Sequence, residues 1–181
     1  TFLLERDSLE LVLQVSNYHH SRAGIWNDIY LGSNEDMQVQ SIINLALDLF
    51  LIGSIFIMGL YHFGLFQLRT KEKSTLYFAL LCFFIALRTS FHNSVLFYIM
   101  FPDFPWDIYL KMDYSTLYLP AIVFLLFFRH LYPKEFTREF IRPAIVVCLL
   151  FGLFTIFTTP FVFSQYLSYF QIVILFLSAY S

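Results

Sequence analysis

Charged residues are scarce in this sequence. Asp, Glu, Lys and Arg make up 13% of its 181 residues, which is about half the fraction found in an ordinary soluble domain. This shortage excludes a water-soluble enzyme domain, a disordered tail and a basic nucleic-acid binder. The net charge of −2 is too small to identify a partner of either sign.

Cysteine is nearly absent, and the residue patterns of catalytic sites are missing. Cys82 and Cys148 both lie inside apolar runs, so they form neither a disulfide framework nor a metal-ligand cluster. The sequence contains no phosphate-binding loop, no nucleotide-binding glycine pattern and no Ser/His/Asp arrangement. We therefore expect this chain itself to have no catalytic residues, cofactor or metal.

Apolar residues make up 59% of the sequence, and they gather after a polar part of about 40 residues. The charge-free stretch Leu49–Leu68 is long enough, at 1.5 Å per residue, to cross a hydrocarbon core of about 30 Å. Two further apolar stretches follow: Ser74–Phe101, with Arg88 as its only charge, and the shorter Tyr114–Phe128. Each of the three predicts a membrane-spanning helix.

The last charge-free stretch, Pro143–Ser181, is too long for one crossing of about 20 residues. We place a turn from Thr158 to Gln165, because Pro160 breaks the helical ladder and small polar side chains satisfy freed carbonyls. The predicted fold is mainly α, a polytopic transmembrane bundle over 41–181. Its helices are expected at about 45–68, 74–99, 112–131, 144–162 and 166–181, the last one truncated because the chain is expected to be a fragment.

Lys and Arg gather in two of the predicted loops, whereas the outer loop 101–113 has Lys111 against three aspartates. The positive-inside rule then predicts a multi-pass plasma-membrane protein with its N-terminal part outside the cytoplasm. The basic residues of the two cytoplasmic loops are Arg69, Lys71, Lys73, Arg129, Lys134, Arg138 and Arg142.

The polar part, residues 1–40, has the pattern of β-structure. Leu9–Asn17 alternates apolar and polar residues, with Val12 as the exception, and Ile25–Gly32 follows as a second strand. A loop at 33–36 precedes the first helix. Because two strands cannot bury a core by themselves, we interpret 1–40 as the terminal β-hairpin of a truncated extracytoplasmic β-sandwich.

A series of short patterns follows in a fixed order along nearly the whole chain: Val15–Asn17, Gly24–Ile25, Leu31–Gly32, Gly59–Phe66, Leu76–Leu80, Ala86–Arg88, Asp113–Tyr114 and Phe128–Glu135. This ordered set resembles the bacterial seven-transmembrane receptors with diverse intracellular signalling modules. The resemblance implies an outer jelly-roll domain that binds carbohydrate or another small ligand, and seven helices.

The resemblance also implies a cytoplasmic output domain in cis, beyond the sequence given. In this family the output is a histidine kinase of a two-component system, a diguanylate cyclase or a phosphatase. A kinase or cyclase output implies a homodimer. The lipid bilayer and a small extracytoplasmic ligand are the other expected partners, and nucleic acid is not one.

Arg88 is the charged residue that needs an explanation, because an intramembrane arginine costs about 2.5 to 3.5 kcal/mol at the bilayer centre. Asp113 and Asp48 lie at a similar depth near the outer ends of neighbouring predicted helices. We hypothesise that Arg88 pairs with Asp113 or Asp48 and ties these ends together. The alternative is that Arg88 snorkels outward alone.

Several histidines have two interpretations each. His62 and His92 fall in predicted helices, and because histidine as a residue type can sense protons, they serve either proton sensing or packing with a hydrogen bond to a neighbour. In the polar part, an aromatic face beside hydrogen-bonding groups suits a carbohydrate ligand, although a solvated hairpin turn explains the same residues. These possible ligand contacts are His19, His20, Arg22 and Trp26.

Three functions follow from these patterns. The first is a sensor that relays ligand binding to the output domain through helix displacement. The second is a transporter or its accessory subunit, for which Arg88 and the break at Thr158–Pro160 are the candidate midplane features. The third is a structural membrane anchor. The ordered resemblance and the short link between hairpin and first helix favour the sensor.

Overall fold

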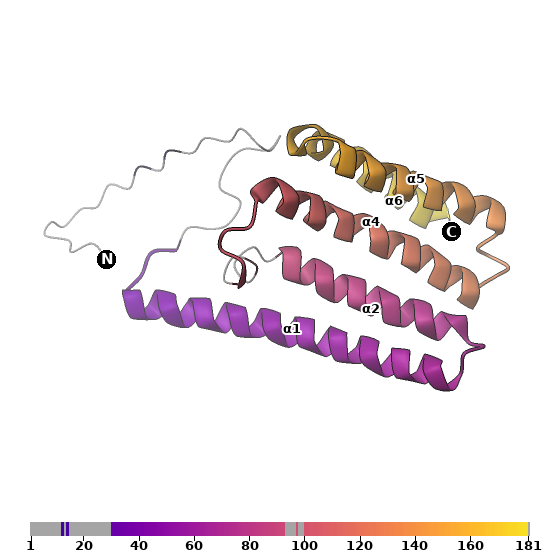
Figure 1. The fold of residues 1–181 in the computed structure, drawn as a ribbon, viewed down its shortest axis with the longest axis horizontal. Helices are drawn as coiled ribbons and strands as arrows, with labels where there is room; N and C mark the ends of the chain where they lie inside the picture. Colours follow the sequence, from indigo (N-terminus) through magenta and orange to yellow (C-terminus); the bar gives the residue numbers. More distant parts are fainter. Residues whose placement is uncertain (1–11, 13, 15–29, 93–96, 98–99, 181) are drawn as a thin grey trace, which may run out of the picture.

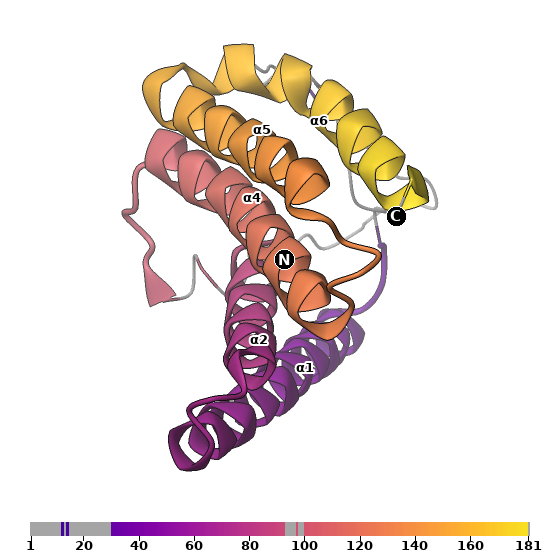
Figure 2. The ribbon, with the colours of Figure 1, turned by 90° about the vertical axis from the view of Figure 1, so that its right-hand side faces the viewer.

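The computed structural model describes residues 12, 14, 30–92, 97 and 100–180 of the chain. This part is mainly helical, and its helices run back and forth side by side in chain order (Figure 1). Neighbours along the chain contact each other, and α6 also touches α4. In the view turned by 90° the helices form a curved row (Figure 2). The helices are α1 (Asn34–Leu68), α2 (Lys73–His92), α4 (Trp106–Leu131), α5 (Arg138–Phe157) and α6 (Pro160–Tyr180).

The described residues form five helices that follow one another in the predicted order. Three of them, α1, α2 and α4, are long and apolar enough to cross a membrane, and the apolar part of α5, Ile141–Phe157, is shorter. The predicted strand Leu9–Asn17 and most of Ile25–Gly32 lie outside the described residues. Residues 30–32, which are described, have no regular secondary structure.

Helix α1 begins earlier than the sequence predicts. Residues 33–36 were expected to form a loop, but the Ser33 hydroxyl accepts a hydrogen bond from the Asp36 amide at 3.1 Å and donates one to the Asp36 carboxylate at 2.6 Å. Ser33 is therefore an N-cap, and Glu35 and Asp36 put negative charge at the positive end of the helix dipole. The loop prediction is wrong because a Ser-x-x-Asp pattern starts a helix here.

The predicted start of the third helix is also wrong, and the predicted end of the second lies mostly outside the described residues. Helix α2 is described over Lys73–His92, and of the predicted remainder at 93–99 the structure describes residue 97, which is helical. Helix α4 begins at Trp106 and not at 112, so most of the predicted outer loop is helical. Pro105, with φ at −61°, precedes its first turn, and Asp107 lies in that turn, where both residue types favour a helix start.

The fourth predicted helix starts after Pro143, but α5 begins at Arg138 and contains Pro143. The break before α6 falls at Thr158 and Thr159, inside the predicted turn, whereas residues 164 and 165 are already helical. Helix α6 starts at Pro160 because proline at the first helical position loses no intrahelical hydrogen bond.

The buried side chains lie mostly between α4, α5 and α6. A larger aromatic cluster fills the half where α4 begins, and a smaller one, Leu125, Ile141 and Ala144, lies where α4 meets the start of α5. Helix α1 is different, because Gly59 is its one buried residue. The buried members of the larger cluster are Phe91, Tyr109, Leu110, Tyr114, Tyr118, Cys148, Phe163 and Phe170.

Charge divides the two ends of the bundle. The α1–α2 and α4–α5 connections lie together at one end, which we call the basic end (Figure 1, right). The opposite end, where α1 and α4 begin, we call the acidic end. The basic end carries Arg69, Lys71, Lys73, Arg129, Lys134, Arg138 and Arg142 against Glu72, Glu135 and Glu139, and the acidic end carries Glu35, Asp36, Asp103 and Asp107.

Candidate functional site: a polar cluster between helices

Arg88 and Asp113 come together across the α2–α4 contact. Arg88 lies near the last turn of α2 and Asp113 in the third turn of α4, so the antiparallel helices bring both to the same level in the half nearer the acidic end. Arg88 Nη1 lies 3.8 Å from Asp113 Oδ1 and donates a hydrogen bond of 3.2 Å to the Asp113 carbonyl. One guanidinium thus contacts both the carboxylate and the backbone of α4.

This contact is partly shielded from solvent, with side-chain exposures of 31% for Arg88 and 19% for Asp113. The Asp113 carbonyl also accepts a hydrogen bond of 2.6 Å from the Thr116 hydroxyl. A charged side chain among apolar helices is costly unless it meets a partner. The guanidinium of Arg88 therefore takes Asp113 as its partner where water is scarce, and this contact stabilises the packing of α2 on α4.

Two further polar contacts join α4 to α5 in the same half of the bundle. The hydroxyls of Tyr118 and Thr155, which are 2% and 0% exposed, form a hydrogen bond of 3.2 Å. Lys111 Nζ donates a hydrogen bond of 2.9 Å to the Ile156 carbonyl, which belongs to the last turn of α5 and has no partner within its own helix. We call Arg88, Lys111, Asp113, Tyr118 and Thr155 the polar cluster.

The polar cluster connects three helices. Each of its members contacts a backbone carbonyl or another side chain of a neighbouring helix. Within the described ranges, no three His, Cys, Asp or Glu side chains lie close enough together to hold a metal ion. These contacts can hold α2 and α5 in one position relative to α4, and a change in the contacts can shift that position.

The other residues singled out in the sequence lie elsewhere. Asp48 is half-buried on α1, while the ion pair that the structure gives Arg88 runs to Asp113. His62 Nδ1 lies 3.0 Å from the Met58 carbonyl of its own helix, and His92 is the last residue of α2. His19, His20, Arg22 and Trp26 lie outside the described residues.

Sequence reasoning missed Tyr118, Thr155 and Lys111. Tyr118 and Thr155 lie inside apolar runs. The signal that could have found them is that polar side chains in spanning helices often form hydrogen bonds to a neighbouring helix. Lys111 was assigned to a loop, and only the true start of α4 places it on a helix. The structure therefore widens the predicted pair into a cluster across three helices.

Comparison with known proteins agrees with this architecture. No curated protein and no solved structure matches the chain. A family model described as 7TM diverse intracellular signalling matches residues 44–181, which is more than half of the chain. Together with its long apolar helices, this match identifies the chain as a multi-pass membrane protein that belongs to the 7TM diverse intracellular signalling family.

Proposed function

We propose that this chain is the membrane-embedded relay of a bacterial receptor, which passes ligand binding outside the cytoplasm to a signalling domain inside it. The observation that carries the proposal is the family match over 44–181, which covers all the described helices except the start of α1. The geometry of α1 and of the polar cluster supports a relay in two ways.

Helix α1 has the length that a mechanical connection needs. Its 35 residues span about 52 Å at 1.5 Å per residue, which is more than the hydrocarbon core of about 30 Å. The excess puts the capped first turn at Ser33 beyond the apolar layer, next to the polar N-terminal part. A displacement of that part therefore moves a continuous helix that ends at the α1–α2 connection.

The polar cluster links α2, α4 and α5, so that a displacement of one of these helices moves the others. Arg88 joins α2 to α4, and Lys111 and Thr155 join α5 to α4. A shift of α1 against α2 is then passed to α4 and α5 through these contacts. Helix displacement of this kind is the motion we propose for the relay.

For orientation and output we propose the arrangement that the charges favour. The basic end faces the cytoplasm and the N-terminal part lies outside the plasma membrane. The output domain follows in the same polypeptide and is a histidine kinase or a diguanylate cyclase, with a homodimer as the active form. The outer part carries a jelly-roll sandwich that binds a small ligand.

We propose carbohydrate as that ligand, with Trp26, His19, His20 and Arg22 at its site. The test uses the full-length receptor in nanodiscs and a panel of soluble mono- and oligosaccharides, with output activity as the readout. We expect one class of sugar to change the output, and Trp26→Ala to weaken that response while Trp106→Phe, on α4, leaves it intact. No response to any sugar, or an unchanged response in Trp26→Ala, contradicts this assignment.

The complete reading frame tests the relay itself. We expect two further apolar helices after α6, followed by a kinase, cyclase or phosphatase domain. Further helices in an inverted or parallel repeat with no soluble domain would instead indicate a transporter. The two outcomes are distinguished by sequence alone, before any activity is measured.

A further inference from the structure

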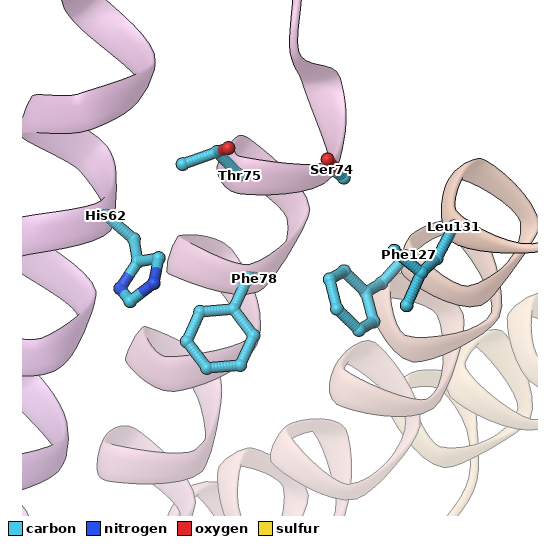
Figure 3. A pocket seen from close by; sticks show the side chains of 6 residues that line it. All are labelled: His62, Ser74, Thr75, Phe78, Phe127 and Leu131. Atoms are coloured by element: carbon cyan, nitrogen blue, oxygen red, sulfur yellow. The ribbon is translucent and has the colours of Figure 1, made fainter.

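A pocket at the basic end is not used by the relay. It has a volume of about 210 Å³ and lies over α2 between α1 and α4 (Figure 3). Its floor is apolar, and three of its lining side chains are polar. The lining residues are His62 from α1, Ser74, Thr75 and Phe78 from α2, and Phe127 and Leu131 from α4.

The hydroxyls of Ser74 and Thr75 differ from the other helical hydroxyls of the chain. Those of Ser54, Thr89 and Ser115, for example, each donate to a carbonyl three or four residues earlier in their own helix. Ser74 and Thr75 lie in the first turn of α2, where no such carbonyl belongs to the helix. In the described part of the chain neither side chain forms a hydrogen bond, so both donors are available to a ligand in the pocket.

His62 adds a third polar group. Its Nδ1 lies 3.0 Å from the Met58 carbonyl, which leaves Nε2 for a ligand. The ring packs against Phe78 with a centroid distance of 4.5 Å, and Phe78 in turn packs against Phe127 at 5.7 Å. These aromatic contacts hold the imidazole beside the apolar floor of the pocket. The three rings come from α1, α2 and α4.

The charges around the pocket are positive. Arg69 forms an exposed ion pair of 3.8 Å with Glu72, whereas Lys71 and Lys73 form no ion pair with any described residue. Both lysines are exposed, and Lys73 directly precedes Ser74. A pocket between long apolar helices, directly after Lys71 and Lys73 in the sequence, suits the headgroup of an anionic lipid.

We propose that this pocket binds one anionic phospholipid, with the phosphate at Ser74 and Thr75 and the glycerol end of the lipid against Phe78 and Phe127. A volume of about 210 Å³ equals that of about seven liquid water molecules at roughly 30 Å³ each, enough for a phosphodiester and its nearest carbons. Lys71 and Lys73 supply the charge that favours an anionic over a zwitterionic lipid. The site requires that the basic end lies at a membrane surface and does not require that the chain is a receptor.

The test compares lipid retention by the purified protein in native mass spectrometry, after incubation in mixed micelles of phosphatidylglycerol and phosphatidylcholine. We expect the wild type to retain one phosphatidylglycerol in preference to phosphatidylcholine. Ser74→Ala/Thr75→Val removes both hydroxyls and keeps the charges, and we expect at least a fivefold loss of retention. Leu131→Trp, at an exposed position on the rim, fills the pocket and gives a second variant with the same expected loss.

A charge-matched pair of variants separates a site from general attraction to the surface. Lys71→Gln/Lys73→Gln removes two charges beside the pocket, and Lys134→Gln/Arg138→Gln removes two at the same end but on the α4–α5 connection and the first residue of α5. We expect about a fivefold loss per charge for the first pair and little change for the second. Equal losses in both pairs, or equal retention of the two lipids by the wild type, would overturn the proposal.

Competition distinguishes a bound lipid from a bound soluble phosphate. Inorganic phosphate or glycerol 3-phosphate at millimolar concentration is added before the lipid is measured. We expect neither to displace phosphatidylglycerol, because neither reaches the apolar floor formed by Phe78 and Phe127. Displacement by either compound would show that the pocket takes a free phosphate, and the lipid assignment would then be wrong.

Discussion

At the scale of single residues, Gly59 controls how closely α1 approaches α2. A Cβ atom at Gly59 would lie 2.9 Å from Phe83 Cε1 and 3.2 Å from Cys82 Cβ, whereas Gly64 has no such neighbour within 4 Å. Gly59→Leu must therefore push the helices apart, and we expect a loss of about 1 to 3 kcal/mol. The measurement is thermal unfolding in detergent, followed by labelling of the buried Cys82 with a thiol-reactive dye.

Gly64→Leu is the matched control, because it adds the same side chain to the same helix at an open position. We expect its unfolding midpoint to stay close to that of the wild type. If Gly59→Leu and Gly64→Leu melt together, the close approach of α1 to α2 does not contribute to stability.

The Arg88–Asp113 contact predicts that mutating Arg88 and mutating Asp113 lower the stability by different amounts. Arg88→Leu leaves the Asp113 carboxylate in an apolar setting without its cation, whereas Asp113→Asn keeps the carbonyl that accepts the 3.2 Å hydrogen bond from Arg88. We expect Arg88→Leu to be the more destabilising, and a coupling free energy of about 1 to 2 kcal/mol in the double-mutant cycle. Unfolding by SDS in bicelles, followed by circular dichroism, gives the four values. Additivity within about 0.3 kcal/mol would show that the two side chains are not coupled.

At the scale of helices, the sequence predicts number and order well and helix ends poorly. Long apolar runs decide the number, because a crossing needs about 20 apolar residues. The ends depend on local chemistry that apolar content does not report: Ser33 caps α1, Pro105 precedes α4, and α5 runs through Pro143. The partner of Arg88 could likewise not be decided from the sequence. It depends on the packing of α2 against α4, and the apolar runs do not show which helices pack together.

Lys111 gives a prediction for the end of α5. Its ammonium donates to the Ile156 carbonyl, in the last turn of the helix, and such a hydrogen bond contributes about 0.5 to 1.5 kcal/mol. We expect Lys111→Met to speed hydrogen exchange of the last-turn amides of α5 by about two- to tenfold, without changing exchange in α2. Lys71→Met, at the opposite end, is the control. Unchanged exchange in Lys111→Met would mean that the contact does not hold this turn.

At the scale of the whole molecule, the distribution of charge predicts its direction in the membrane. Seven Lys and Arg residues lie at the basic end, and such residues are retained on the cytoplasmic side. Asp103→Cys and Thr70→Cys place thiols at exposed positions of the acidic and basic ends. In intact cells an impermeant maleimide should label Asp103→Cys, and Thr70→Cys only after lysis. The parent chain should stay unlabelled because Cys82 and Cys148 are buried, and the reverse pattern would invert the proposed orientation.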